Sequence, residues 1–199
     1  MSSEKVTRGF GLLEKFLSIQ RMKRAQKIIK KFKKSEYILD IGCGSYPLFL
    51  INSDFDVKCG IDQEVKEMEI KSLHLHLKQH DICANLDLPF KDNYFDVITM
   101  LAFIEHLDSV QLLKVLKESY SMLNEGGILI ITTPAMWSDI PLKIMAKLHL
   151  VSPDEIEEHK KAFNLIELNN LLLKANFKQE NIQMGYFEFF LNLWACAKK

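Results

Sequence analysis

The chain has 199 residues, of which 48% are hydrophobic, so it can bury a core large enough for one ordinary domain. Its 26 basic and 26 acidic residues give a net charge of zero, which argues against a nucleic-acid polyanion as the main partner. No apolar run approaches the roughly 18 residues of a membrane span, and residues 1–11 lack the apolar core of a signal peptide, so we expect a cytoplasmic protein.

The first predicted element is an amphipathic helix over about residues 10–32. Apolar side chains recur along one stripe, while the opposite face carries lysines and arginines. Such a face is most often solvated on a helix that caps a sheet, but it could also contact an anionic membrane surface or an acidic substrate. The basic residues are Arg21, Lys23, Arg24, Lys27, Lys30, Lys31, Lys33 and Lys34.

A buried strand and a glycine turn follow in the sequence LDIGCGS at residues 39–45. An apolar run that ends in Asp40, with Gly42 and Gly44 close behind, is typical of a strand that feeds a nucleotide-binding turn. Glycines let the backbone turn sharply and approach a ligand, and the start of the next helix would offer free N–H groups. We therefore expect residues 40–45 to form the floor of a pocket.

Acidic residues end the next two predicted strands. The second strand, over residues 57–62, places Asp62 where a ribose-binding carboxylate lies in dinucleotide folds. The third alternates over residues 73–82 and ends in His80, Asp81 and Ile82. Together with the glycine turn, these acids strengthen the prediction of a nucleotide-type cofactor site.

The next predicted elements continue an α/β pattern. A fourth buried strand covers residues 95–101, and a helix follows Asp108 as its N-cap. Gly126 and Gly127 interrupt the chain before a fifth strand at residues 128–132.

The last part of the sequence predicts a lid, a helix and two strands. Ser138 begins a helix in the lid, and Asn164 with Glu167 forms a capping box for a helix over residues 164–176. Two strands are predicted at residues 178–186 and 189–197.

Five motifs in this order resemble the class I S-adenosylmethionine (SAM)-dependent methyltransferases, in particular the small-molecule group called type 11. They are LDIGCGS, GID, HDI, FDVITMLAFIEHL and EGGILIITTP, all within residues 37–134. The resemblance implies an α/β fold with a Rossmann-like, doubly wound, seven-stranded mixed sheet in the order 3-2-1-4-5-7-6 and helices on both faces.

The resemblance also implies a single methyltransferase domain with four parts. Residues 1–35 would form a helical cap, residues 36–134 the SAM-binding core, residues 135–162 a lid or substrate segment, and residues 163–199 the last helix and a strand pair.

The same resemblance assigns roles around the glycine turn. Gly42, Cys43 and Gly44 would form the loop beside the methionine and ribose parts of the cofactor. Asp40 would lie at the methionine end, where a negative charge suits the ammonium and sulfonium groups. For Asp40 the alternative is an acid that only orders the loop.

Further roles follow for the ends of the other strands. Asp62 would accept hydrogen bonds from both ribose hydroxyls, and Gln63 could edge the adenine. Asp81 and Ile82 match the adenine clamp of the family, the carboxylate taking the exocyclic amine. Ordinary strand-end and turn acids are the alternatives. The two residues where the fourth strand opens onto the methyl donor are Leu101 and Ala102.

Methyl transfer from SAM needs mainly alignment and exclusion of water, and a base only where the acceptor loses a proton. Glu105 and His106, which follow the fourth strand, are the residues best placed to act as that base. A structural His106, bonded across its loop, is the alternative. His159 in the segment EHKKAF is a second candidate, although a charged surface run is the preferred explanation for it.

Three histidines raise the question of a metal. His74, His76 and His80 are predicted on one face of the third strand, where two histidines at alternate positions can chelate an ion. Because we expect this strand to be an edge strand, its polar side can face water, and we predict no metal. The cysteines, which show no C-x-x-C spacing, predict neither a zinc site nor a disulfide framework.

The methyl acceptor is the least constrained prediction. The fourth strand ends in MLAF instead of the Asn/Asp-Pro-Pro-Tyr of enzymes that methylate base amines, so a small-molecule acceptor is favoured, with a lipid-like, quinone-like or sugar-linked metabolite as a hypothesis. Residues that could line an apolar acceptor pocket, although most should be core, are Met136, Trp137, Met145, Phe187, Phe189, Phe190 and Trp194.

Two other classes compete with this prediction. A nicotinamide-dependent oxidoreductase needs a third glycine where Pro47 stands, so it is disfavoured. A non-catalytic protein that binds SAM or serves as a scaffold on the same fold remains the alternative.

Overall fold

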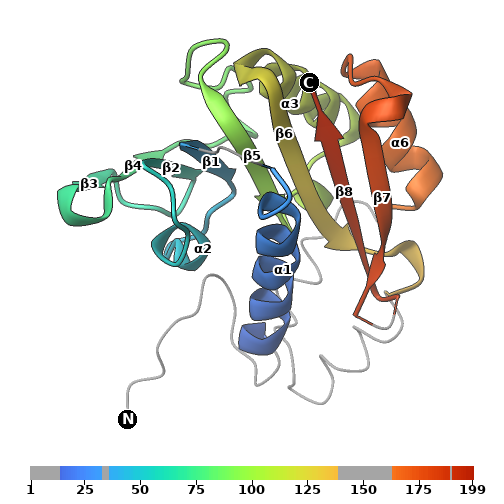
Figure 1. Cartoon of the computed structure of the whole chain (residues 1–199), viewed down its shortest axis with the longest axis horizontal. Coiled ribbons are helices and arrows are strands. Elements are labelled where there is room, and N and C mark those ends of the chain that lie inside the picture. The colour runs from blue at the N-terminus through green and yellow to red at the C-terminus, as the bar shows by residue number, and fades with distance from the viewer. Residues whose placement is uncertain (1–13, 33–35, 139–162, 189) are drawn as a thin grey trace.

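The computed structural model describes residues 14–32, 36–138, 163–188 and 190–199, which build an eight-stranded sheet with helices on both faces (Figure 1). The strand order is β3-β4-β2-β1-β5-β6-β8-β7. The strands are β1 (Tyr37–Ile41), β2 (Val57–Asp62), β3 (Met68–Ile70), β4 (Leu75–Gln79), β5 (Phe95–Leu101), β6 (Leu123–Pro134), β7 (Ile182–Phe187) and β8 (Asn192–Lys198).

The principal strands confirm the order expected from the resemblance. Strands β4, β2, β1, β5 and β6 run parallel, β8 is antiparallel to β6, and β7 is antiparallel to β8. The carboxyl ends of the parallel strands therefore meet at the same end of the sheet, which is where ligands bind in open α/β folds.

The expectation of seven strands, with the third at the edge, is wrong because β3 covers the outer side of β4. Met68 and Ile70 pair antiparallel with Leu77 and Leu75. A 3-10 turn, η1 (Lys71–Leu73), and the left-handed backbone of His74 at φ 50° reverse the chain between the two strands. β3 is too short, and its side chains too exposed, to give the alternation by which strands are recognised.

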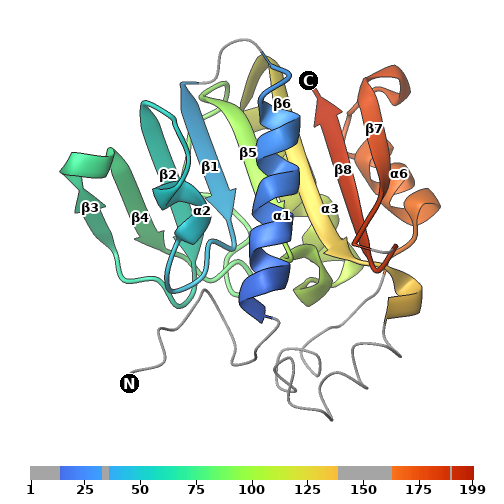
Figure 2. The ribbon, with the colours of Figure 1, turned by 60° about the horizontal axis from the view of Figure 1, so that its bottom comes forward.

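Helices α1 (Glu14–Ile29) and α2 (Leu48–Ile51) cover one face of the sheet, and α3 (Ser109–Met122) and α6 (Leu165–Lys174) cover the other (Figure 2). α1 buries Met22, Ala25 and Ile28, which lie three residues apart and so share one helical face. Within the described ranges, no helix has both the length and the apolar character needed to cross a membrane. The remaining helical pieces are the 3-10 turns η2 (Ile104–His106), η3 (Met136–Ser138) and η4 (Gln179–Asn181).

The basic residues of α1 do not all face water. Lys23 and Lys27 are exposed, as is Lys30 directly after the helix, whereas Arg21 and Arg24 are half-buried. The guanidinium of Arg24 lies 5.3 Å from the ring centre of Phe187 and 5.4 Å from that of Trp194. The arginines are therefore part of the packing between α1 and the sheet.

Both predicted helix caps are present. The side chain of Asp108 accepts hydrogen bonds from the N–H groups of Val110 and Gln111 at 2.8 and 2.9 Å, and the backbone N–H of Asp108 donates to Oε1 of Gln111 at 3.0 Å. Asn164 and Glu167 form the same reciprocal pair at the start of α6. These caps fix where the two helices on the far face begin.

Strand β6 begins earlier than predicted. It starts at Leu123, and Gly126, at φ 81°, lies inside it. The pairing with β5 shifts register between Phe95 and Val97, so the glycines bulge the strand instead of ending it.

Asp96 joins three strand starts at the end of the sheet opposite the carboxyl ends. Its Oδ2 accepts hydrogen bonds from the N–H groups of Glu36 and Tyr37 at 2.8 and 3.0 Å. Its Oδ1 accepts a hydrogen bond from the side-chain amide of Asn124 at 2.8 Å. One carboxylate thus aligns the beginnings of β1, β5 and β6.

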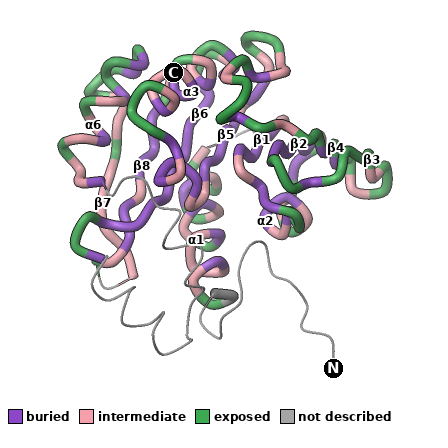
Figure 3. Tube along the Cα trace, turned by 180° about the vertical axis from the view of Figure 1, so that it is seen from behind, coloured by how far each residue is buried: buried purple, intermediate pink, exposed green. Residues whose placement is uncertain are grey.

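Buried residues concentrate along the strands, while the outer turns are exposed (Figure 3). Two points far apart along the chain meet beside β6, since Ala135 bridges to Phe163 and the N–H of Met136 donates to the Phe163 carbonyl at 3.0 Å. The predicted lid helix, Met145 and His159 lie outside the described residues, as does Phe189.

Candidate functional site

The turn after β1 is built on glycines with left-handed backbone. Gly42 has φ 78° and Gly44 has φ 73°, a region that residues with a Cβ rarely adopt. A Cβ on Gly42 would also lie 2.3 Å from Cδ2 of Phe103, so a side chain does not fit there. The N–H groups of Gly42 and Cys43 donate to the Ile61 carbonyl at 2.9 and 3.2 Å, which fixes the turn against β2.

Asp62 ends β2 and orders the chain on both sides of it. Its side chain is buried, Oδ2 accepts a hydrogen bond from the N–H of Gly44 at 3.0 Å, and Oδ1 accepts one from the N–H of Glu64 at 2.8 Å. Asp62 also lines the cleft described below, where a carboxylate at the end of the second strand is the type of group that binds ribose hydroxyls. Asp62 therefore has a structural role in the turn, in addition to any role in binding a ligand.

A cleft opens at the carboxyl ends of β1, β2 and β4 and contains about 380 Å³ of empty space, part of it open to solvent. The predicted site residues that line it are Gly42, Asp62, Gln63, Asp81, Ile82 and His106. Other residues in its wall, which the sequence analysis did not assign to a site of this kind, are Ile61, His80, Cys83, Phe103 and Leu107.

Phe103 is the most informative of these unassigned residues. Its ring packs where a Cβ of Gly42 would be, so the glycine and the aromatic ring depend on each other. A glycine in a turn indicates that another part of the protein packs closely against it, but the sequence alone does not tell which residue that is.

Asp40 is 3% exposed, and the hydroxyl of Thr99 on β5 donates to its Oδ1 at 2.6 Å. Burial and the nearby carboxylate of Asp62 raise the pKa of Asp40 to about 7, although the Thr99 hydrogen bond lowers it. Asp40 lies behind the wall of the cleft. A cation bound next to it would stabilise the ionised form of its carboxyl.

The turn after β4 is organised by Asp81. Its Oδ1 accepts hydrogen bonds from the N–H groups of Cys83 and Ala84 at 2.8 and 3.2 Å, while the side chain remains exposed. The next residue, Ile82, is buried and presents an apolar surface in the cleft wall.

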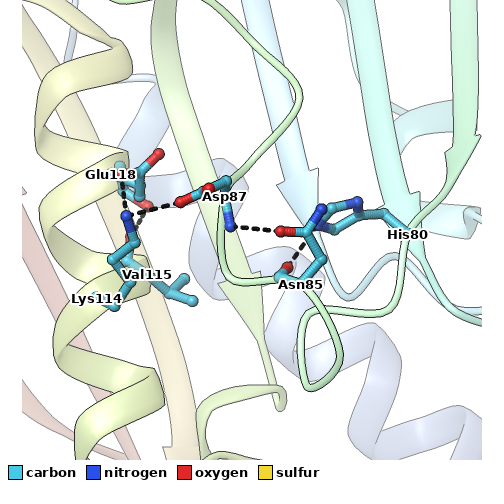
Figure 4. A network of polar contacts seen from close by, with 7 residues as sticks. His80, Asn85, Asp87, Lys114, Val115 and Glu118 are labelled. Atoms are coloured by element: carbon cyan, nitrogen blue, oxygen red, sulfur yellow. Dashed lines mark hydrogen bonds and ion pairs between the residues drawn. The ribbon is translucent and has the colours of Figure 1, made fainter.

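A chain of polar contacts connects this turn to α3 (Figure 4). The Nε2 atom of His80 lies 2.9 Å from the carbonyl oxygen of Asn85, whose side chain accepts a hydrogen bond from the N–H of Asp87 at 3.1 Å. Asp87 then pairs with Lys114 at 2.8 Å, and Lys114 also contacts Glu118 at 3.0 Å. Asp87 is exposed, and Lys114 and Glu118 are only half-buried, so solvent weakens these ion pairs and they contribute little to stability.

Cys43, Leu101 and Ala102 are not among the residues that line this cleft, and their cofactor roles stay predictions. The Cys43 sulfur packs toward β2, because a Cβ on Gly60 would lie 2.9 Å from it. Leu101 packs with the core on the α1 side, and Ala102 turns the chain at φ 54° while its N–H donates to the Thr132 carbonyl at 2.9 Å.

The two candidate bases lie in different surroundings. His106 is half-buried and lines the cleft. Glu105 is 1% exposed and its Oε2 accepts a hydrogen bond from the Thr133 hydroxyl at 3.0 Å. Burial raises the pKa of Glu105 to about 7, although the positive charge of Arg21 lowers it. The structure thus gives His106 access to the cleft and places Glu105 behind it.

The three histidines do not share one strand face as predicted, because β4 contains only His76, while His74 precedes it and His80 follows it. The Nδ1 of His74 lies 2.8 Å from the Asp56 carbonyl oxygen, and His80 contacts the Asn85 carbonyl oxygen. In the part of the chain that the structure describes, no group of three or more His, Cys, Asp or Glu residues could hold a metal ion.

Comparison with known proteins identifies the family. Residues 15–182 match the family model described as a methyltransferase domain. The chain is 37% identical over 107 residues to an uncharacterized protein of Methanocaldococcus jannaschii, a match that covers 52% of this chain and 44% of that protein. It is 32% identical over 114 residues to a human protein named probable tRNA methyltransferase 9B, covering 57% of this chain and 24% of the other.

The fold is also found among solved structures. A SAM-dependent methyltransferase from Archaeoglobus fulgidus superposes with a TM-score of 0.67 at 20% identity, over 94% of this chain and 97% of that one. The chain spans less than half the length of the curated relatives that it matches. Since the family model covers most of the chain, including β1, β2, β4, β5 and β6, the chain belongs to the methyltransferase domain family, and it shares the fold of SAM-dependent methyltransferases.

Proposed function

We propose that this protein transfers the methyl group of SAM to a small-molecule acceptor and releases S-adenosylhomocysteine. The observation that carries the proposal is the cleft, in which Gly42, Asp62 and Asp81 meet at the carboxyl ends of adjacent parallel strands. These are the residues to which the resemblance assigns cofactor contacts.

The residues around the cleft fit SAM in chemical type. Gly42 and Asp62 both line the cleft, and a carboxylate at the end of the second strand is the type of group that binds ribose hydroxyls in folds of this kind. The hydrogen bonds of Asp81 to its own turn both use Oδ1, which leaves Oδ2 for an amine. Ile82 offers an apolar surface for an aromatic ring.

Asp40 suits the charged end of the same cofactor. Its buried carboxyl has a raised pKa of about 7, so a neighbouring ammonium or sulfonium would stabilise the ionised form. We therefore assign Asp40 to the methionine end of SAM. The role of its partner Thr99 is to hold the carboxyl in position.

When bound, SAM supplies a methyl group that is already activated on a sulfonium. The protein then has to align the acceptor and exclude water. His106 lines the cleft and is our candidate base for an acceptor that must lose a proton. Glu105, buried behind it and bonded to Thr133, is the second candidate.

An apolar acceptor remains our hypothesis for the body of the substrate. Phe187 and Trp194 lie together under Arg24 on the α1 side of the sheet. Trp137 is half exposed and lies 4.9 Å from the ring of Tyr186. These rings supply flat apolar surfaces of the kind that bind small ligands.

A tRNA acceptor is the second candidate, because one group of relatives carries the name probable tRNA methyltransferase 9B. The exposed lysines of α1 could contact phosphates. The zero net charge of the chain and the MLAF end of the fourth strand argue against it.

Calorimetric titration with SAM, with S-adenosylhomocysteine and with NAD as a control tests the proposal. We expect micromolar binding of the first two and no heat from NAD. Transfer of labelled methyl groups to total tRNA, compared with transfer to a small-molecule extract, then separates the two acceptor classes. Failure of both SAM and S-adenosylhomocysteine to bind would favour the scaffold alternative.

Substitution of Asp62 tests the cofactor site directly. We expect Asp62→Ala to weaken SAM binding by about 1.5 to 3 kcal/mol, the scale of lost hydrogen bonds to a charged group. Because Asp62 also orders Gly44 and Glu64, the thermal midpoint of the variant must be measured alongside. Unchanged affinity in a folded variant would remove Asp62 from the site.

A further inference from the structure

The segment that follows β4 brings Asp81 and Ile82 into the wall of the cleft without a helix or strand of its own. Ile82 and Leu88 are buried and hold the segment to the core, whereas residues 83–85 between them are exposed. The position of the Asp81 carboxylate therefore depends on the hydrogen bonds that close the turn at residues 81–85.

Three of these hydrogen bonds join residues of the turn to each other. Oδ1 of Asp81 accepts from the N–H groups of Cys83 and Ala84, and the N–H of Asn85 donates to the Asp81 carbonyl at 2.9 Å. Such bonds set the shape of the turn. They do not fix its position relative to β2, whose carboxyl end forms another part of the cleft.

His80 supplies a hydrogen bond from outside the turn (Figure 4). Its Nε2 lies 2.9 Å from the carbonyl oxygen of Asn85, and its backbone N–H donates to the Asp62 carbonyl at 3.1 Å. The side chain is half-buried and lines the cleft. His80 thus connects the strand end that carries Asp62 to the turn that carries Asp81.

The partner of the His80 imidazole determines its role as a donor. A carbonyl oxygen can only accept a hydrogen bond, so we assign the hydrogen to Nε2. A phenylalanine ring would fill similar space without an N–H, whereas the side-chain amide of glutamine keeps an N–H donor. Substitution can therefore separate the volume of the ring from its hydrogen bond.

The turn places the atom of Asp81 that is left for a ligand. Because Oδ1 accepts both N–H groups of the turn, Oδ2 is the oxygen left for a ligand donor. A carboxylate only accepts hydrogen bonds, so it favours an amino group over a carbonyl oxygen on a purine. Hydrogen bonds weaken steeply when their geometry is disturbed, and this preference therefore depends on how firmly the turn is held.

We propose that His80 is a positioning residue that holds the Asp81 turn at the cleft and so strengthens the preference of the enzyme for a purine with an amino group. It acts through Asp81, by its bond to the Asn85 carbonyl. Loss of this bond leaves the turn closed by its own hydrogen bonds but less firmly placed. This inference rests on the proposed function, because it takes the cleft as the SAM site.

Calorimetry on the full chain tests the base preference with S-adenosylhomocysteine and S-inosylhomocysteine, which has an oxygen in place of the purine amino group. The wild type should bind the adenosine compound at least about tenfold more tightly, the scale of a hydrogen bond to a charged group. His80→Phe should lower this ratio by about threefold or more, and His80→Gln should keep most of it. An unchanged ratio in His80→Phe, or an equal fall in His80→Gln, would overturn the proposal.

A double-mutant cycle with Asp81→Ala shows whether His80 acts through Asp81. Asp81→Ala removes the acceptor for the amino group and should by itself bring the ratio close to one. In that background, His80→Phe should leave the ratio unchanged. A further fall would show that His80 reads the base without Asp81, and its role as a positioning residue would be wrong.

His74 is the matched control, because it makes the same kind of bond before the start of β4. Its Nδ1 lies 2.8 Å from the Asp56 carbonyl oxygen, and His74 is not among the residues that line the cleft. His74→Phe should lower the thermal midpoint and keep the wild-type base ratio. If His74→Phe and His80→Phe lower the ratio equally, the ratio follows stability alone and the proposal is overturned.

The titrations of the wild type separate this inference from the proposed function. If S-adenosylhomocysteine does not bind, the proposed function is wrong, and the inference is overturned with it. If S-adenosylhomocysteine and S-inosylhomocysteine bind equally well, the proposed function stands and the inference alone is overturned.

Discussion

Asp40 combines deep burial with a titration near neutral pH. Its pKa is about 7 in the folded protein and about 3.8 in a model peptide, so between these values the folded state binds more protons than the unfolded state. Stability from this group is therefore lost as pH rises from about 4 to about 7. Asp40→Asn should raise the free energy of unfolding at pH 8 by at least about 1 kcal/mol, and much less near pH 4.

Urea unfolding of wild type and Asp40→Asn across this pH range measures the effect. The variant should bind SAM more weakly, because it loses the charge opposite the cofactor's cation. If the variant is less stable than the wild type at pH 8, the protein itself stabilises the ionised carboxylate of Asp40, and the prediction is wrong.

Gly42 combines left-handed backbone with a close neighbour, and a second glycine allows the two effects to be separated. Gly126 has a similar φ of 81°, but a Cβ there would come no closer than 3.7 Å to Lys198. Gly126→Ala should therefore cost about 1 kcal/mol from the backbone alone. Gly42→Ala should cost about 1 to 3 kcal/mol more, because the new methyl group overlaps Phe103.

Denaturant unfolding of both variants tests this difference, and cofactor titration shows whether the turn still binds. Equal costs at the two positions would mean that Phe103 moves aside without penalty.

At the level of elements, the cap of α3 connects the exit of β5 to the helix that covers the far face. Asp108→Ala removes the acceptor for two N–H groups and should lower the free energy of unfolding by about 1 kcal/mol. Asp87→Ala is the control, because its ion pair with Lys114 is exposed and its loss should leave the unfolding midpoint near that of the wild type. A larger loss for Asp87 than for Asp108 would contradict this ranking.

The elements also show what the sequence could and could not predict. Long apolar strands such as β5, and caps such as Asp108, carry local signals, so their positions were predicted well. The strand β3 was missed because three exposed residues give no periodicity, and the early start of β6 was missed because Gly126 looked like a break. The partners of Asp40 and Arg21 lie on other elements, and no local pattern reveals them.

At the scale of the whole molecule, cofactor binding should be linked to stability and to protons. Cofactor at about 100 times its dissociation constant should add about 2.7 kcal/mol to the free energy of unfolding. If Asp40 faces the cationic end, binding releases a proton below pH 7, so affinity should rise with pH up to about 7 and then level off.

Calorimetry in buffers with different ionisation enthalpies measures this proton release. The Asp40→Asn variant has no carboxyl group at this position and should not release this proton on cofactor binding. If the wild type binds the cofactor with the same affinity at pH 6 and at pH 8, the positive charge of the cofactor does not lie next to Asp40.

Substitutions of Asp96, at the end of the sheet far from the cleft, should reduce activity although Asp96 contacts no ligand. It holds the starts of three strands whose opposite ends form the cleft, at the full length of a strand from any ligand. A screen that ranks positions by lost activity alone would place Asp96 beside Asp62 and Asp81 as a binding residue. The two kinds of defect separate only when abundance and midpoint are recorded for every variant, so that lost alignment is not mistaken for lost chemistry.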